Sequence, residues 1–211
     1  LRIPLSKIPY VVLSSICACI LITLTYHAVD YLDVGLVMLI LYCFPLGVAS
    51  ISYFRGKSKI VFVQWLSMVV LILGLYLMLS SGDQVLNLYG LFISFLGLLF
   101  FIAFIVTASD LSEQIGATTF NLYVSLLGII FLTVGFILPL GFEMELPHTK
   151  TGIFAIFANG LFYISSWVLF FKGASIIGAT RSSMLACIEP LFAALLAIIL
   201  LKQILSVTEW I

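Results

Sequence analysis

A carboxylate stands in the middle of the last long apolar run of the chain. Glu189 directly precedes Pro190, within the apolar stretch 177–201. A bilayer-spanning helix needs about 20 apolar residues, so an acid and a helix breaker would lie near mid-membrane. Ionisable groups at that depth need a partner or a wet cavity, which makes them functional candidates. Glu189 is therefore a candidate for proton or substrate coupling; the alternative is a hydrogen-bonded acid that only packs.

Polar and aromatic side chains on other apolar runs are candidates to line a cavity. Asn159 and Tyr163 share one face at helical spacing, with Trp167 adjoining. Tyr42 lies on a stripe of small and polar residues that includes Pro45. An amide and aromatic rings in this arrangement either contact a small molecule or form a packing seam between helices.

His27 and Arg181 lie nearer the ends of their apolar runs. His27 would reach interfacial water or take part in a proton relay. Arg181 would extend to the interface, or would pair with an anionic substrate or an acid on a neighbouring helix. Glu189 is eight residues further along than Arg181, about 12 Å at helical rise, so it is the deeper coupling candidate.

The composition indicates an all-α integral membrane protein, a polytopic helix bundle. Of 211 residues, 64% are hydrophobic and 9% charged, and the mean hydropathy is +1.31, whereas soluble domains carry roughly a quarter charged residues. Long apolar runs between short polar breaks are typical of helices rather than barrel strands. The zero net charge and unclustered basic residues give no indication of nucleic-acid binding. The cysteines have neither metal nor disulfide spacing, so no metal and no cofactor is predicted.

The apolar runs predict about seven complete membrane spans. Short polar breaks separate them, including one at 109–116. An N-terminus in the cytoplasm places most basic residues inside, which sets the expected orientation. The acidic 109–116 break, which has no base, is the exception. The predicted spans are residues 9–28, 34–54, 60–80, 86–108, 117–139, 152–172 and 177–201, and an eighth could begin near Val207.

Two of these spans are related by an internal offset. Pro45 and Pro190 are each central in their spans and 145 residues apart (190 − 45 = 145), and Trp65 and Trp210 have the same separation. The second and seventh spans run in opposite directions, because five span-to-span steps separate them. Paired proline-interrupted spans in inverted halves are a sequence indicator of a transporter's midplane site, and Pro45 and Pro190 are the predicted hinges. The alternative is that prolines are simply common in membrane helices.

The segment from Gly178-Ala179-Thr180-Arg181 to Glu189-Pro190-Leu191-Phe192 resembles the signature of the drug/metabolite transporter superfamily, most closely its EamA-type branch. The segment 42–49 resembles a degenerate copy, with Phe44 where the later copy has Glu189. The resemblance implies ten spans in two inverted five-helix halves. The chain would then be a fragment, with 1–80 the C-terminal part of the first repeat (helices three to five) and 81–211 the second repeat (helices six to nine and the start of ten). The glutamate usual after each proline-bearing helix is missing, which leaves its role open.

The leading functional hypothesis is a secondary transporter that moves a small metabolite, such as an amino acid or a drug-like solute, by alternating access. A gradient is the expected driving force, since the chain has no glycine-rich ATP-binding motif. Export across the plasma (inner) membrane is the expected direction and location. The expected partners are the lipid bilayer and a small solute, with a proton as candidate coupling ion; a homodimer is left open. The alternatives are an intramembrane enzyme, for which no nucleophile or metal motif is present, and a seven-helix receptor.

Overall fold

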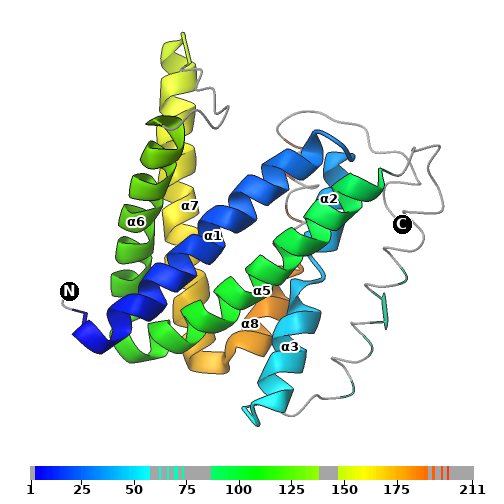
Figure 1. Ribbon diagram of the computed structural model, residues 1–211, viewed down its shortest axis with the longest axis vertical. Helices are drawn as coiled ribbons and strands as arrows, with labels where there is room; N and C mark the ends of the chain where they lie inside the picture. The colour runs from blue at the N-terminus through cyan, green and yellow to red at the C-terminus, as the bar shows by residue number, and fades with distance from the viewer. Residues whose placement is uncertain are drawn as a thin grey trace.

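The computed structural model describes residues 3–57, 62, 66, 69–70, 73, 87–137, 147–189, 192, 196 and 199. Across these residues the regular structure is helical, as predicted (Figure 1). The elements are η1 (Leu5–Lys7), α1 (Ile8–Val29), α2 (Val34–Leu41), α3 (Phe44–Phe54), α5 (Leu88–Ile115), α6 (Ala117–Ile137), α7 (Lys150–Ile177) and α8 (Ala179–Ala186).

Five segments of the described chain are long and apolar enough to cross a membrane. They match five of the seven predicted spans. The predicted span 60–80 and most of the predicted span 177–201 lie outside the described residues, as does Pro190. Helices suit this environment because each satisfies its own backbone hydrogen bonds in lipid. The candidate spans are Leu5–Val29, Val34–Phe54, Leu88–Ile115, Ala117–Gly135 and Lys150–Ile177.

Polar caps fix where three of the helices begin. The Asp33 carboxylate accepts from the Gly35 N–H at 2.8 Å and starts α2. The Asn87 side chain accepts from two N–H groups at the start of α5, and Thr149 caps α7 through the N–H of Gly152. Because the first N–H groups of a helix have no partner within it, these residues define the three starts locally.

The predicted break at 109–116 is wrong. Helix α5 continues through Asp110 and Glu113 and ends only at Gly116. Asp110 accepts hydrogen bonds from Arg55 (3.0 Å) and Lys57 (2.6 Å), so the charge is neutralised at the helix surface without interrupting it. The acidic segment therefore lies beside the basic one, which resolves the exception in the charge pattern.

Two glycines turn one helix directly into the next. Gly116 (φ 86°) joins α5 to α6, and Gly178 (φ 89°) joins α7 to α8. Each glycine is followed by Ala-Thr, and each donates its N–H to a carbonyl four residues earlier, at 3.0 and 2.9 Å. Helix α7 also runs five residues past the predicted end at 172. Backbone conformation, rather than a drop in hydropathy, ends these helices.

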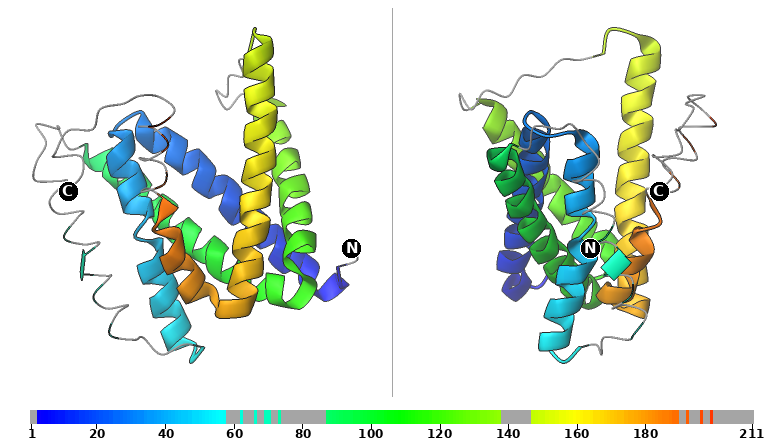
Figure 2. Two further views of the ribbon diagram at one scale, coloured as in Figure 1. Left: turned by 180° about the vertical axis from the view of Figure 1, so that it is seen from behind. Right: turned by 90° about the vertical axis from the view of Figure 1, so that its right-hand side faces the viewer.

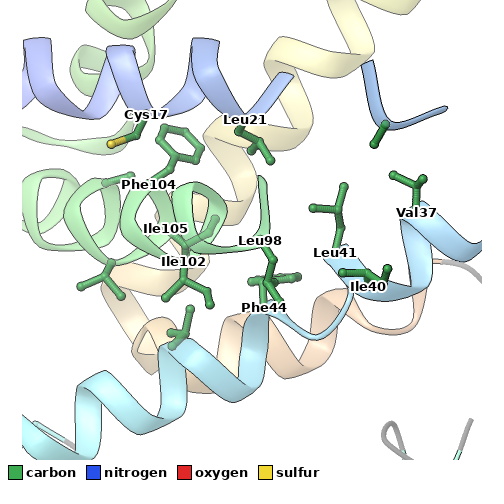
Figure 3. Close-up of a cluster of buried hydrophobic side chains, with 14 of the residues drawn as sticks. Cys17, Leu21, Val37, Ile40, Leu41, Phe44, Leu98, Ile102, Phe104 and Ile105 are labelled. Atoms are coloured by element: carbon green, nitrogen blue, oxygen red, sulfur yellow. The ribbon is translucent and has the colours of Figure 1, made fainter. Parts of the chain in front are cut away.

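Helix α5 is the centre of the bundle. It runs beside α1 and also contacts α2, α3, α6 and α7 (Figure 1). Cys17 and Phe104 meet between α1 and α5, while Phe44, Leu98 and Ile102 meet between α3 and α5 (Figure 3). Small residues permit this close approach, as is usual between membrane helices. A Cβ atom added at Gly90, for example, would lie 2.7 Å from Cγ of Leu32.

The bundle has one basic end. The N-terminus, the end of α3 and the turns at Gly116 and Gly178 lie together there (Figures 1 and 2). We call it the basic end because it carries Lys7, Arg55, Lys57, Lys172 and Arg181. Towards the opposite end, α6 and α7 diverge from α1 and α5. Accordingly, the buried residues of α7 are Phe171 and Ala174, both near the basic end.

Candidate functional site

Two helices are interrupted at equivalent positions. The second predicted span is divided into α2 and α3 by a break at Tyr42 and Cys43, directly before Phe44-Pro45. Helix α8 ends at Ala186, followed by a break at Cys187 and Ile188. Adding 145 to the bounds of α2 gives the bounds of α8, and the two breaks coincide in the same way. The offset that relates the prolines in the sequence thus also relates the helix interruptions.

At each break, a backbone hydrogen bond joins residues three apart in the chain rather than the four of an α-helix. The N–H of Cys43 donates to the carbonyl of Ile40 at 3.1 Å, and the N–H of Ile188 donates to the carbonyl of Leu185 at 3.1 Å. The local cause is proline, which has no N–H to give to the carbonyl four residues earlier. That carbonyl is Leu41 for Pro45.

The two breaks approach each other at Tyr42 and Glu189. The Tyr42 hydroxyl lies near enough to the Glu189 carboxylate for the two groups to interact electrostatically. Helices α3 and α8, which flank these residues, lie side by side (Figure 2). The Glu189 side chain is exposed in the structure. A hydroxyl from one break and an exposed carboxylate from the other therefore lie near each other.

Aromatic rings contact one another across three helices. Phe44 of α3 contacts Phe101 of α5 with ring centroids 4.4 Å apart, and Phe101 contacts Trp167 of α7 at 6.4 Å. Tyr163 follows at 6.2 Å from Trp167. We call Phe44, Phe101, Trp167 and Tyr163 the aromatic ladder. Sequence reasoning identified the two α7 rings as candidates but missed Phe101, because an apolar run gives no sign of which ring meets the site.

Asn159 lies one turn from Tyr163 on α7 and is exposed. Tyr163 is 51% exposed and lies across from Tyr26 and Cys19 of α1, near enough to interact electrostatically. These polar groups thus occur on the part of α7 that diverges from α1. An uncovered amide in a membrane span requires a hydrogen-bonding environment, and a wet cavity would supply one.

Two predicted site residues lie away from the breaks. His27 is at the far end of α1, where its ring contacts Tyr31 and Tyr89 and its Nδ1 lies 3.4 Å from an Asp30 carboxylate oxygen. Arg181 is exposed in the first turn of α8, at the basic end. The structure therefore places Tyr42 near Glu189 and joins Tyr163 and Trp167 in the aromatic ladder, while His27 and Arg181 lie away from the breaks.

The chemistry of the site is that of non-covalent binding. It offers a carboxylate, a hydroxyl, freed backbone carbonyls and aromatic faces. Within the described parts of the chain, no group of three or more His, Cys, Asp or Glu side chains is placed to hold a metal ion. Cys17, Cys19, Cys43 and Cys187 are all free thiols.

Comparison with known proteins identifies the class of the molecule. Curated protein sequences and solved structures give no match. The model of the EamA-like transporter family, part of the drug/metabolite transporter superfamily, matches residues 88–211. This match covers more than half of the chain, and members of the family are generally transporters rather than enzymes. The chain, a multi-pass membrane protein with five candidate spans among its described residues, therefore belongs to the EamA-like transporter family.

Proposed function

We propose that the protein is a secondary transporter that moves a small metabolite by alternating access, driven by a gradient and directed to export across the plasma membrane. The family supports the transporter class. The observation that carries the proposal is the pair of register-matched helix breaks, which approach each other at Tyr42 and Glu189. Discontinuous helices that meet near the bilayer midplane are how many transporters build a solute site.

An inverted repeat underlies this proposal, with 1–80 in the first half and 81–211 in the second. The 145-residue offset between α2 and α8 supports it, as do their opposite directions: α2 runs from the Asp33 cap toward the centre and α8 from the basic end toward the centre. Two halves of similar structure but opposite orientation can exchange conformations, which opens a central site to each side of the membrane in turn.

Each break would act as a hinge. Pro45 removes one backbone hydrogen bond from its helix, and the break supplies flexible joints on both sides of the site. Trp167 and Tyr163 of the aromatic ladder would contact the solute, with Asn159 further toward the divergent end of α7. Glu189 would exchange its interaction with Tyr42 for a proton or a solute group as the site changes its exposure.

Transport and coupling can be tested with the full-length protein in proteoliposomes that contain a pH-sensitive dye. We expect pooled small metabolites to drive proton movement, and Glu189→Gln to reduce the substrate-dependent proton flux at least tenfold. Glu113→Gln is the matched control, because Glu113 is an exposed acid at the basic end of α5, and it should retain wild-type flux.

The outcomes separate transport from coupling. Solute flux without proton movement, equal in wild type and Glu189→Gln, would keep the transporter and remove Glu189 from coupling. No flux with any pool, from protein that elutes as a folded species, would contradict the proposed function.

A further inference from the structure

Each of the two helix breaks contains a cysteine. Tyr42 and Cys43 form the break between α2 and α3, and Cys43 directly precedes α3. Cys187 and Ile188 form the other break, and Cys187 directly follows α8. Both thiols are half-buried and free. The proposed transport function uses neither of them, so two nucleophilic groups at the breaks have no assigned role.

The packing of α3 against α8 brings these two cysteines to one place. Helix α3 runs from the centre of the bundle to the basic end, α8 runs from the basic end to the centre, and the two lie side by side (Figure 2). In such an antiparallel pair, the start of one helix lies beside the end of the other. The two thiols are accordingly near enough to interact electrostatically, and Cys187 interacts in the same way with Tyr42.

Neither thiol has a strong partner of its own. The Sγ atom of Cys43 lies 3.6 Å from the carbonyl oxygen of Leu39, and the Sγ atom of Cys187 lies 3.8 Å from the carbonyl oxygen of Ser183. Because a thiol is a weak hydrogen-bond donor, little is lost when either S–H proton leaves. The resulting thiolates are soft ligands, which select soft metal ions such as Cu(I).

The number of ligands narrows the choice of metal ion. A structural zinc site has four ligands, usually all from protein side chains. Among the residues that the structure describes, no group of three or more His, Cys, Asp or Glu side chains is placed to hold a metal ion. Cu(I), by contrast, is stable with only two sulfur ligands in a linear arrangement. A pair of thiols from two neighbouring helices therefore suits Cu(I) rather than zinc.

We propose that Cys43 and Cys187 form a binding site for one Cu(I) ion and that the bound ion stops transport. The ion lies between the two Sγ atoms. Both S–H protons pass to water, no electron is transferred, and the occupied site carries one negative charge. The ion then joins the start of α3 to the end of α8, so the two breaks cannot move apart. This block rests on the proposed transport function, whereas the binding of the metal does not.

Competition with a chelator tests the site. The full-length protein, freed of its affinity tag and kept in detergent without oxygen, is titrated with Cu(I) held by bicinchoninate, whose Cu(I) complex is coloured. We expect wild type to remove one equivalent of Cu(I) that Cys43→Ser and Cys187→Ser each fail to remove. X-ray absorption of the wild-type complex should show two sulfur neighbours around the copper, a measurement that needs no variant.

Cys19→Ser is the matched control. Cys19 is also a half-buried free thiol, but it lies on α1, and Cys17 is two residues before it. Side chains two residues apart in a helix do not face each other, so these two thiols cannot hold one ion between them. The Cys19→Ser variant should therefore take up Cu(I) as wild type does.

Flux measurements test the block of transport. In proteoliposomes, one equivalent of Cu(I) should lower the wild-type solute flux at least tenfold. It should leave Cys43→Ser and Cys187→Ser at their own metal-free rates. Each comparison is made within one variant, so an effect of the substitution on folding or on transport does not imitate the result.

Three results would overturn the site: no uptake of Cu(I) by folded wild type, uptake unchanged in either Cys43→Ser or Cys187→Ser, or copper with fewer than two sulfur neighbours. Uptake that depends on both cysteines but leaves the solute flux unchanged would overturn the block of transport. The same uptake by a folded protein that transports no solute would support the site and contradict the proposed transport function instead.

Discussion

At the residue scale, Asp110 shows how a charged side chain can be misread from the sequence. Together with Glu113 it gave the 109–116 segment the polarity of a loop, yet both acids lie on the surface of α5. The partners of Asp110 are Arg55 and Lys57, more than fifty residues away along the chain. Only the packing of α3 against α5 brings these groups together, so no local sequence pattern predicts these ion pairs.

The Asp110 pairs should contribute modestly to stability. Because the basic side chains are about half exposed, we expect Asp110→Asn to lower the free energy of unfolding by about 1 kcal/mol or less. The loss should disappear at high salt, where exposed pairs are screened. Thermal unfolding of the full-length protein in detergent at two salt concentrations measures it. A large salt-independent loss would mean that Asp110 supports the fold in another way, and Glu113→Gln provides the baseline.

At the scale of elements, glycines and prolines decide where the helices stop and bend. Gly116 and Gly178 adopt positive φ with extended ψ (138° and 152°), a combination essentially restricted to glycine. Tyr42 and Cys43 form a break because Pro45 cannot donate a hydrogen bond. At these three positions the helix ends because of the chemistry of a single glycine or proline, which can be located in the sequence. The sequence alone did not show that Gly116, rather than the acids before it, ends α5.

The two glycine turns predict a matched set of alanine variants. Gly116→Ala and Gly178→Ala should each destabilise the protein by about 1–3 kcal/mol, through backbone strain alone, because no atom lies within 4 Å of the added methyl group. Gly128→Ala is the control. It also has open space, but it lies inside α6, where alanine is neutral or favourable. Equal unfolding temperatures for all three variants would refute the strain argument.

At the scale of the whole molecule, the distribution of charge orients the bundle. The basic end holds the N-terminus and the ends of α3, α5 and α7, and the other end holds Asp30, Asp33 and Asn87. Basic residues near membrane spans favour the cytoplasmic side. With the basic end in the cytoplasm, as we expect, the divergence of α6 and α7 would lie on the outer side of the membrane.

Cysteine labelling tests this orientation. In intact cells, we expect a membrane-impermeant maleimide to label Asp30→Cys, which is exposed at the outer end of α1, and to leave Lys7→Cys unlabelled until the cells are permeabilised. The four native cysteines lie within helical spans and their breaks, so the parent protein gives the background. If only Lys7→Cys were labelled in intact cells, the protein would have the opposite orientation in the membrane.

Sequence by itself determined the class of this protein and much of its local structure. Hydropathy gave the helical membrane bundle, because lipid forces each span to satisfy its own backbone hydrogen bonds. Proline spacing indicated that two spans are interrupted, and the signature around Glu189 indicated the family, which the match over residues 88–211 confirms.

Tertiary structure alone decided which side chains meet. Every apolar run offers many rings and small residues, and in lipid there is no gradient of hydrophobicity to distinguish the buried face from the exposed one. Packing around α5 joined Phe44, Phe101 and Trp167 in one series of ring contacts, placed Tyr42 near Glu189, and kept His27 and Arg181 at the ends of the bundle. These choices depend on contacts between distant segments, so they lie beyond what periodicity can predict.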